Sequence, residues 1–353
     1  MRRADKVFEL KPSVDALLIT SEKNRFYYTG FASTLGYLIV LKDKSFFITD
    51  SRYIEMAKVL EKDAVLIETT GGNAFELVAD VFRQNNIKTV GFEDTEITYS
   101  EYVAFCEKLA GFALVPVGDA ILVQRRFKSD DEIEYITKAQ KITDKAFKNI
   151  LGFIKPDVTE LDIAVELEYQ MRKNGASGLA FDTIVASGQN GSKPHAHPTD
   201  KKIRQGDAIT MDFGARFNGY CSDMTRTVFC GKPNEEMRKI YEVVLRAQTN
   251  ALKNIKCGML CRDGDMLARE VIEANGYGAY FKHSLGHSLG IDVHEAPSMS
   301  PSSQDYLQEN IMMTVEPGIY IPFLGGVRIE DMVVVKQDKI IDLTMSEKNI
   351  IIL

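Results

Sequence analysis

The chain of 353 residues is long enough for two domains, and its 45% hydrophobic content indicates a sizeable core. A net charge of −7, from 43 basic and 50 acidic residues, argues against nucleic acid or an anionic membrane surface as a partner. The two arginines near the start are not followed by a long apolar segment, and no stretch is apolar enough to span a bilayer, so we expect a cytoplasmic protein.

Strand-like and helix-like segments alternate in the first third of the chain. Short apolar runs predict strands at 15–20, 37–42, 45–50, 64–68 and 88–94. Helical spacing predicts helices between them at 52–61, 73–86 and 100–111. These elements indicate an α/β domain that ends near Val123.

A long helix is expected to open the second part of the chain. Ser129 is a good N-cap, and the three acids that follow it suit the positive end of the helix dipole. A second amphipathic helix is predicted at 159–176. The basic stretch between Val123 and Lys128 is the expected boundary, which gives domains 1–123 and 124–353.

Four carboxylates and one imidazole stand in strand-like or glycine-rich surroundings in the second domain: Asp212, Asp223, His287, Glu316 and Glu330. Taken singly, each acid is more often a solvated turn residue or a helix cap, and such a histidine is more often structural. A carboxylate inside an apolar run is costly to bury without a partner. As a set in one kind of context, the five residues indicate metal ions as that partner.

A faint internal repeat supports this interpretation. Residues 203–229 resemble residues 307–335, and each segment contains two apolar strands with a carboxylate in each half, 11 residues apart (212 to 223) and 14 apart (316 to 330). A hairpin can place two such acids side by side. Two facing hairpins would bring four carboxylates to one site, which His287 would join from a separate loop.

Oxygen ligands with one imidazole suit Mn²⁺, Co²⁺, Fe²⁺ or Zn²⁺. With bridging carboxylates, two such ions can lie roughly 3.5 Å apart and activate a water molecule. The residues therefore predict metal-assisted hydrolysis.

Four segments of the second domain resemble the M24 metallopeptidases, the pita-bread family that includes aminopeptidase P, prolidase and methionine aminopeptidase. They are MDFGARFNGYCSDMTRTV, HSLGHSLGIDVHEAP, TVEPGIY and RIED. In the first domain, ITSEKNRFYYTGF and FFITDSRYIEMA resemble the creatinase-type N-terminal domain of aminopeptidase P and prolidase. The resemblance covers essentially the whole chain. It implies a creatinase-like α/β domain followed by a pita-bread (α+β) catalytic domain.

The resemblance also implies a cofactor of two divalent metal ions (Mn, Co, Zn or Fe) and a role for each ligand. Asp212 and Asp223 would bind metal together, and His287 would be the imidazole ligand of one ion. Glu316 would bind metal and accept a proton from water, and Glu330 would bridge both ions.

Further residues match substrate-contacting or supporting positions of the family. His195 and His294 would contact the substrate, where they suit the developing oxyanion and the leaving amine. His197, two residues after His195, is expected to be solvated and to lie outside the site, and His283 would shape its loop. Thr225 and the neighbouring Arg226 would orient Asp223.

Arg328 lies two residues before Glu330 and would share its face of an extended strand. It would support the site, bind a substrate carboxylate or remain a plain surface cation.

The implied activity is hydrolysis of Xaa-Pro bonds by an Xaa-Pro aminopeptidase or Xaa-Pro dipeptidase, acting as a homodimer on peptides with proline in second position. Ser288 follows His287 where the family often has glycine, and no cation follows the HEAP motif in 298–303. The second departure weakens a strict dipeptidase interpretation. A metal-independent creatinase-type amidinohydrolase and a non-catalytic peptide-binding module are the alternatives on this scaffold, although both would be expected to lack several ligands.

Overall fold

A computed structural model describes residues 4–353, so the arginines at positions 2 and 3 lie outside the described residues. The chain divides into two compact units between Arg125 and Arg126. The boundary expected at 123/124 falls within helix α6 (Gly118–Arg126) and stays a prediction. Among the described residues, no helix combines the length and apolar character needed to cross a membrane.

The first unit contains one mixed six-stranded sheet with strand order β4-β3-β2-β1-β5-β6. Its strands are β1 (Ala16–Ile19), β2 (Tyr37–Leu41), β3 (Ser45–Asp50), β4 (Val65–Thr69), β5 (Thr89–Phe92) and β6 (Ala113–Pro116). Its helices are α1 (Asp5–Leu10), α2 (Glu22–Thr29), α3 (Ile54–Ala57), the 3₁₀ helix η2 (Lys58–Leu60), α4 (Ala74–Gln84), α5 (Tyr99–Lys108) and α6. The predicted α/β class is confirmed for this unit.

Two long helices of the second unit begin with reciprocal caps. Helix α7 (Asp130–Ile150) starts where the sequence predicts, because the Ser129 hydroxyl accepts from the Glu132 amide while the Glu132 carboxylate accepts from the Ser129 amide. Helix α8 (Glu160–Lys173) is capped in the same way by Thr159 and Asp162. Both predicted helices are confirmed.

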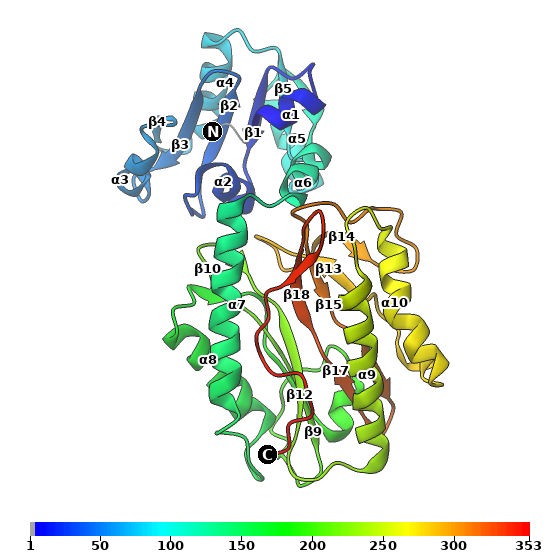
Figure 1. The fold of residues 1–353 in the computed structure, drawn as a ribbon. Helices are drawn as coiled ribbons and strands as arrows, with labels where there is room; N and C mark the ends of the chain where they lie inside the picture. The colour runs from blue at the N-terminus through cyan, green and yellow to red at the C-terminus, as the bar shows by residue number, and fades with distance from the viewer. Residues whose placement is uncertain (1–3) are drawn as a thin grey trace. The chain divides into compact units, whose positions relative to one another are not determined.

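Antiparallel strands of the second unit lie between two pairs of helices (Figure 1). Apolar side chains of α7 and α8 pack with strands β8 (Ile184–Ser187), β9 (Ala208–Phe213) and β12 (Met224–Phe229). Those of α9 (Glu235–Asn254) and α10 (Cys261–Ala274) pack with β15 (Met312–Val315), β17 (Gly325–Arg328) and β18 (Asp331–Val335). The strands therefore form the middle layer of the unit.

The internal repeat corresponds to two similar strand arrangements. Strand β9 pairs antiparallel with β12, and the segment between them forms the hairpin β10 (Ala215–Phe217) and β11 (Tyr220–Cys221). Strand β15 pairs antiparallel with β18, and the hairpin between them is β16 (Gly318–Ile321) and β17. The shorter elements of this unit are β7 (Gly178–Leu179), β13 (Gly286–Ser288), β14 (Glu295–Met299), β19 (Ile340–Asp342) and the 3₁₀ helices η3 (Gly188–Ser192) and η4 (Gly278–Tyr280).

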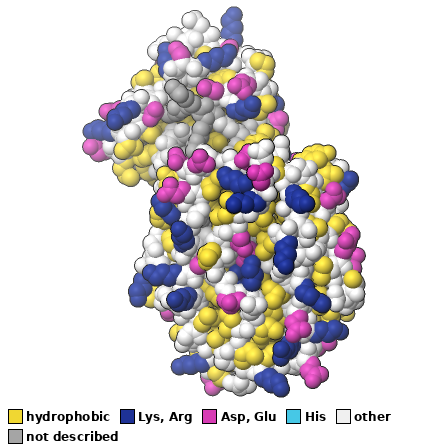
Figure 2. All heavy atoms as spheres, in the orientation of Figure 1, with side chains coloured by type: hydrophobic (Ala, Val, Ile, Leu, Met, Phe, Trp, Pro, Cys, Tyr) yellow, Lys and Arg dark blue, Asp and Glu magenta, His cyan; other side chains and the backbone are white. Residues whose placement is uncertain are grey.

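Charged side chains of both signs are mixed on the face drawn in Figure 2, with hydrophobic side chains scattered between them. Interspersed charges of opposite sign do not focus a strong field of one sign. On this face, electrostatics therefore give no strong preference for a highly charged partner.

Candidate metal centre

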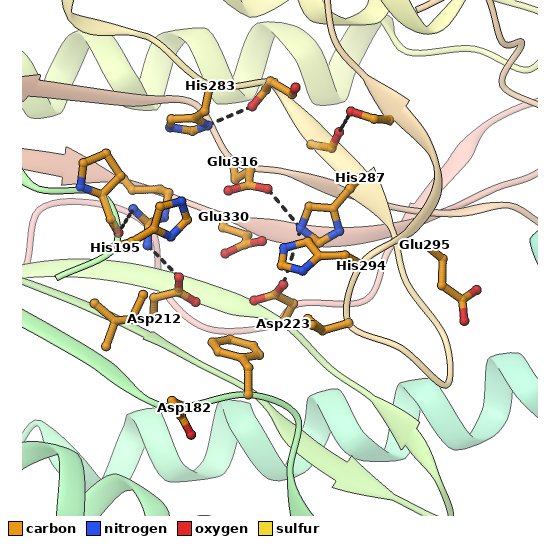
Figure 3. A pocket seen from close by; sticks show the side chains of 18 of the residues that line it. Asp182, His195, Asp212, Asp223, His283, His287, His294, Glu295, Glu316 and Glu330 are labelled. Carbon is orange, nitrogen blue, oxygen red and sulfur yellow. Dashed lines mark hydrogen bonds and ion pairs between the residues drawn. The ribbon is translucent and has the colours of Figure 1, made fainter. Parts of the chain in front are cut away.

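One cavity of the second unit, with a volume of about 790 Å³, brings the predicted ligands together. Asp212, Asp223, His287, Glu316 and Glu330 all line it, and Figure 3 shows their side chains grouped around a common centre. The cavity is also lined by the other side chains singled out from the sequence as candidate contacts: His195, His197, His283, His294 and Arg328.

The two repeated strand pairs deliver the four carboxylates. Asp212 lies on β9 opposite Thr225 of β12, and Asp223 directly precedes β12. Glu316 directly follows β15, and Glu330 directly precedes β18. Because strand pairing brings the two acids of each repeat together, the contacts that build the sheets also build the acidic site.

Close approach of β13 to β15 positions His287. A Cβ atom on Gly286 would lie 2.0 Å from the Thr314 carbonyl oxygen, so glycine is required at that position. The His287 amide donates to Thr314 Oγ1 at 3.0 Å, and this hydroxyl donates to Glu316 Oε1 at 3.0 Å. One threonine thus fixes the imidazole and one carboxylate relative to each other.

The His287 ring turns Nε2 toward two carboxylates of the site. Its Nδ1 lies 3.1 Å from the Ser288 carbonyl oxygen, which can only accept, so Nδ1 carries the proton. Nε2 then directs its lone pair toward Glu316 Oε1 at 3.3 Å and Asp223 Oδ2 at 3.7 Å. Burial lowers the pKa of His287, which favours this neutral form. A lone pair that faces two carboxylates is suited to a cation between them.

The donor set fits a divalent metal ion. One ligand atom from each of Asp223, His287 and Glu330 lies within 4.8 Å of the others. Asp212 Oδ1 is buried and has no hydrogen-bond partner within residues 4–353. Burial, followed by repulsion from neighbouring carboxylates, raises the pKa of Asp223 and Glu330 well above the usual range and that of Glu316 to about 7. An ion would supply the positive charge that their ionised forms need.

Arg328 is buried and engaged in the site. Its Nη2 donates to Asp212 Oδ2 at 2.6 Å, its Nη1 to the Tyr320 hydroxyl at 2.8 Å and its Nε to Thr225 Oγ1 at 2.9 Å. This guanidinium therefore supports the site, and the interpretation as a surface cation is wrong because the side chain is only 4% exposed.

Thr225 connects Arg328 to a second carboxylate. Its hydroxyl donates to Glu330 Oε2 at 2.7 Å, whereas the sequence predicts that it orients Asp223. The neighbouring Arg226 donates from Nη1 to the Glu330 carbonyl oxygen at 2.5 Å. The segment after Asp223 thus contacts the acid of the other repeat, a contact that sequence proximity does not reveal.

The candidate substrate-contacting histidines lie at the exposed part of the cavity. The rings of His287 and His294 have centroids 4.4 Å apart, and burial lowers the pKa of His294. In Figure 3, His195 lies on the Asp212 side of the carboxylates. His195 and His197 are both exposed, so the preference for His195 stays a prediction.

His283 and Tyr320 form a further link at the cavity wall. Nδ1 of His283 lies 2.9 Å from the Ser284 carbonyl oxygen and Nε2 lies 3.0 Å from the Tyr320 hydroxyl. Burial lowers the pKa of His283 to about 3, so the ring is neutral and accepts from the tyrosine. Sequence reasoning missed Tyr320. Its place four residues after Glu316, in the TVEPGIY segment that carries the resemblance, is the signal that could have revealed it.

Both units match known protein families. Residues 134–337 match the model of the metallopeptidase family M24, and residues 9–127 match that of the creatinase/prolidase N-terminal domain. The chain is 40% identical to the Xaa-Pro dipeptidase of Pyrococcus furiosus over 341 residues, which are 96% of each chain.

Two solved structures are similar over nearly their full length. The Xaa-Pro dipeptidase from Bacillus anthracis has a TM-score of 0.96 at 39% identity and covers 100% of this chain and 99% of its own. The X-Pro aminopeptidase from Thermotoga maritima MSB8 has a TM-score of 0.92 at 36% identity, with coverages of 97% and 98%. The likeness therefore extends over both units.

Proposed function

This chain belongs to the metallopeptidase family M24, and on that premise we propose that it hydrolyses the bond between the first residue of a peptide and a proline in second position. The observation that carries the proposal is the convergence of four carboxylates and His287 on one cavity. Relatives named for Xaa-Pro cleavage match almost the whole chain, which supports the choice of substrate.

We propose that two divalent metal ions are held by Asp212, Asp223, His287, Glu316 and Glu330. The unpartnered oxygen of Asp212 and the three-residue ligand group support this assignment. Mn²⁺, Co²⁺, Zn²⁺ and Fe²⁺ all suit such ligands. When bound, such ions polarise a carbonyl oxygen and make a water molecule a better nucleophile at neutral pH.

Glu316 is the proposed proton acceptor for the attacking water. Its Oε1 lies 3.3 Å from His287 Nε2, so this carboxylate faces the centre where the attacking water would be activated. His195 and His294 line the same cavity and would donate hydrogen bonds to the developing oxyanion and to the leaving nitrogen. Their ring N–H groups can donate hydrogen bonds, which the ionised carboxylates of the site cannot do.

We propose that apolar side chains of the cavity receive the proline ring. Phe181, Ile184 and Val293 contribute to the cavity lining. An Xaa-Pro bond has no N–H on the leaving nitrogen, and the ring fixes φ. Recognition through an apolar surface and through the scissile carbonyl does not need that missing donor.

Peptides longer than dipeptides are included in the proposed substrates. Apart from histidines, Arg328 is the cationic side chain in the described lining of the cavity, and it is paired with Asp212. The free carboxylate of a dipeptide therefore gains little from the cavity of one chain. We also propose a homodimer located in the cytoplasm, which light scattering and cell fractionation would test.

A panel of substrates tests the proposal. Metal-free protein is reconstituted with Mn²⁺ or Co²⁺ and given Ala-Pro, Ala-Pro-Phe, Ala-Ala-Phe and creatine, with metal content measured on the same samples. We expect release of alanine from the two proline peptides and no reaction with creatine. Creatine hydrolysis that survives a chelator would favour the creatinase-type activity, and no hydrolysis of any compound would favour a binding module.

A further inference from the structure

A single buried carboxylate joins the two ends of the segment that carries His195. The segment runs from η3 at Gly188 to Thr199, and both His195 and His197 on it line the cavity. Glu160, the first residue of α8, is completely buried beneath it. This carboxylate does not line the cavity, so it does not touch a bound substrate there.

At one end of the segment, Glu160 accepts hydrogen bonds from Ser187 and Asn190. Oε1 receives the Ser187 amide and the Ser187 hydroxyl, each at 2.7 Å. The Asn190 side-chain amide lies 3.1 Å from both oxygens. These donors fix the start of the segment, where strand β8 turns into η3.

At the other end, the same carboxylate accepts from Thr199. Oε2 receives the Thr199 hydroxyl at 2.6 Å and the Thr199 amide at 3.2 Å. The Leu161 amide donates to the Thr199 carbonyl oxygen at 3.0 Å, which adds a backbone contact from α8. The ends of the segment are therefore gathered on one side chain.

The middle of the segment packs against β17. A Cβ atom on Gly326 would lie 2.1 Å from the Gly191 carbonyl oxygen, so the two backbones are in direct contact. Arg328 of the same strand donates from Nη1 to the Pro194 carbonyl oxygen at 3.5 Å. The segment is thus held at its ends by Glu160 and in the middle by the strand that carries Arg328.

A role limited to helix capping does not account for these contacts. The N-terminus of α8 is already capped by Thr159 and Asp162. The side chain of Glu160 instead satisfies donors of the segment, and a buried carboxylate is retained only where such donors compensate its burial.

We propose that Glu160 is a positioning residue for the reaction, which holds the segment 188–199 so that His195 faces the carboxylate cluster. The inference rests on the proposed function. In Glu160→Gln the NH₂ group must face donors at one end of the segment, since both carboxylate oxygens accept from N–H and O–H groups. A misplacement of a contact group by about 1 Å can cost on the order of a hundredfold in rate.

A double-mutant cycle tests this role. The kcat for Ala-Pro-Phe is measured for the wild type, Glu160→Gln, His195→Ala and the double variant, with metal content and pH profile on each. Glu168→Gln, the same change on a partly exposed position of α8, is the control. We expect Glu160→Gln to lower kcat about ten- to a hundredfold with metal content unchanged, and to add less than about twofold in the His195→Ala background. The proposal would be overturned if the kcat losses of the two single variants multiply in the double variant, or if kcat is unchanged in Glu160→Gln.

Hydrogen exchange separates this inference from the proposed function. The Ser187 and Thr199 amides should exchange faster in Glu160→Gln and as in the wild type in Glu168→Gln, whether or not the protein cleaves proline peptides. Thr199→Val removes one donor and leaves the buried carboxylate intact. Like Glu160→Gln, it should lower kcat and speed amide exchange, but by smaller factors. It is used in place of Glu160→Gln if that variant does not fold. Unchanged exchange in Glu160→Gln, or in Thr199→Val used in its place, refutes the positioning role. Absence of peptide cleavage by the wild type refutes the proposed function alone.

Discussion

Replacement of Thr225 by valine tests how far the groups around the ligands control metal binding. The Thr225 hydroxyl donates to Glu330 Oε2 at 2.7 Å and accepts from Arg328 Nε at 2.9 Å. Valine keeps the shape of the buried side chain but removes both hydrogen bonds. Each bond involves a charged group and is therefore worth about 1.5–3 kcal/mol.

The loss of these bonds should weaken metal binding about 10- to 100-fold, the range found when a group that orients a ligand is removed. This corresponds to about 1.4–2.8 kcal/mol in binding free energy. Calorimetric titration of Mn²⁺ into the Thr225→Val protein, after its metal has been removed with a chelator, measures the change directly. Thr137→Val is the control, because the Thr137 hydroxyl donates to the Ile133 carbonyl oxygen within α7. A metal affinity of Thr225→Val within about twofold of the wild type would refute the reasoning.

Three further predictions concern protonation, a buried ion pair and substrate length. The pKa of Glu316 is raised to about 7 when no metal is bound. The free energy of unfolding of chelator-treated, metal-free protein should therefore fall as pH rises from about 4.5 through about 7, by up to about 1.4 kcal/mol per pH unit from this group. Denaturant titrations across that range should show a smaller slope for Glu316→Gln, and an equal slope contradicts the assignment. Lys128→Met removes the cation that pairs with the buried Glu295 carboxylate and should lower the free energy of unfolding by about 3–5 kcal/mol. Lys138→Met, the control, removes an exposed pair with Glu134 and should change it by less than about 1 kcal/mol. Ala-Pro-Phe should have a higher kcat/KM than Ala-Pro, and the reverse order would argue for a carboxylate-binding group outside the described cavity lining.

Local sequence patterns predicted most strands of the first unit and the helices α7 and α8 of the second, whereas α9 and α10 were not predicted. The strands of the first unit were predictable because they are short apolar runs, and α7 because Ser129 and the acids after it form a capping signal. Strand β6 was missed because two of its residues are exposed and the other two only partly buried. Helix α2 was missed because it buries Asn24 and Arg25, which leaves no simple apolar stripe. The pita-bread arrangement implied by the resemblance is confirmed by the similar solved structures.

The convergence of the four acidic side chains on one cavity was predictable because carboxylates are rare inside apolar strands. The groups that hold them were not, since their contacts join distant parts of the chain. Arg328 meets Asp212 across 116 residues, and Lys128 meets Glu295 across 167. Such pairs follow from the packing of segments far apart in the chain, which periodicity within one segment does not specify.

Coupling between bound metal and peptide cleavage tests the central claim most directly. Mn²⁺ is titrated into protein from which metal has been removed with a chelator. Alanine release from Ala-Pro-Phe and the number of bound ions per chain are followed on the same sample. The account predicts no release without metal and a rate that rises with occupancy to a plateau near two ions per chain. Undiminished release from metal-free protein would contradict it.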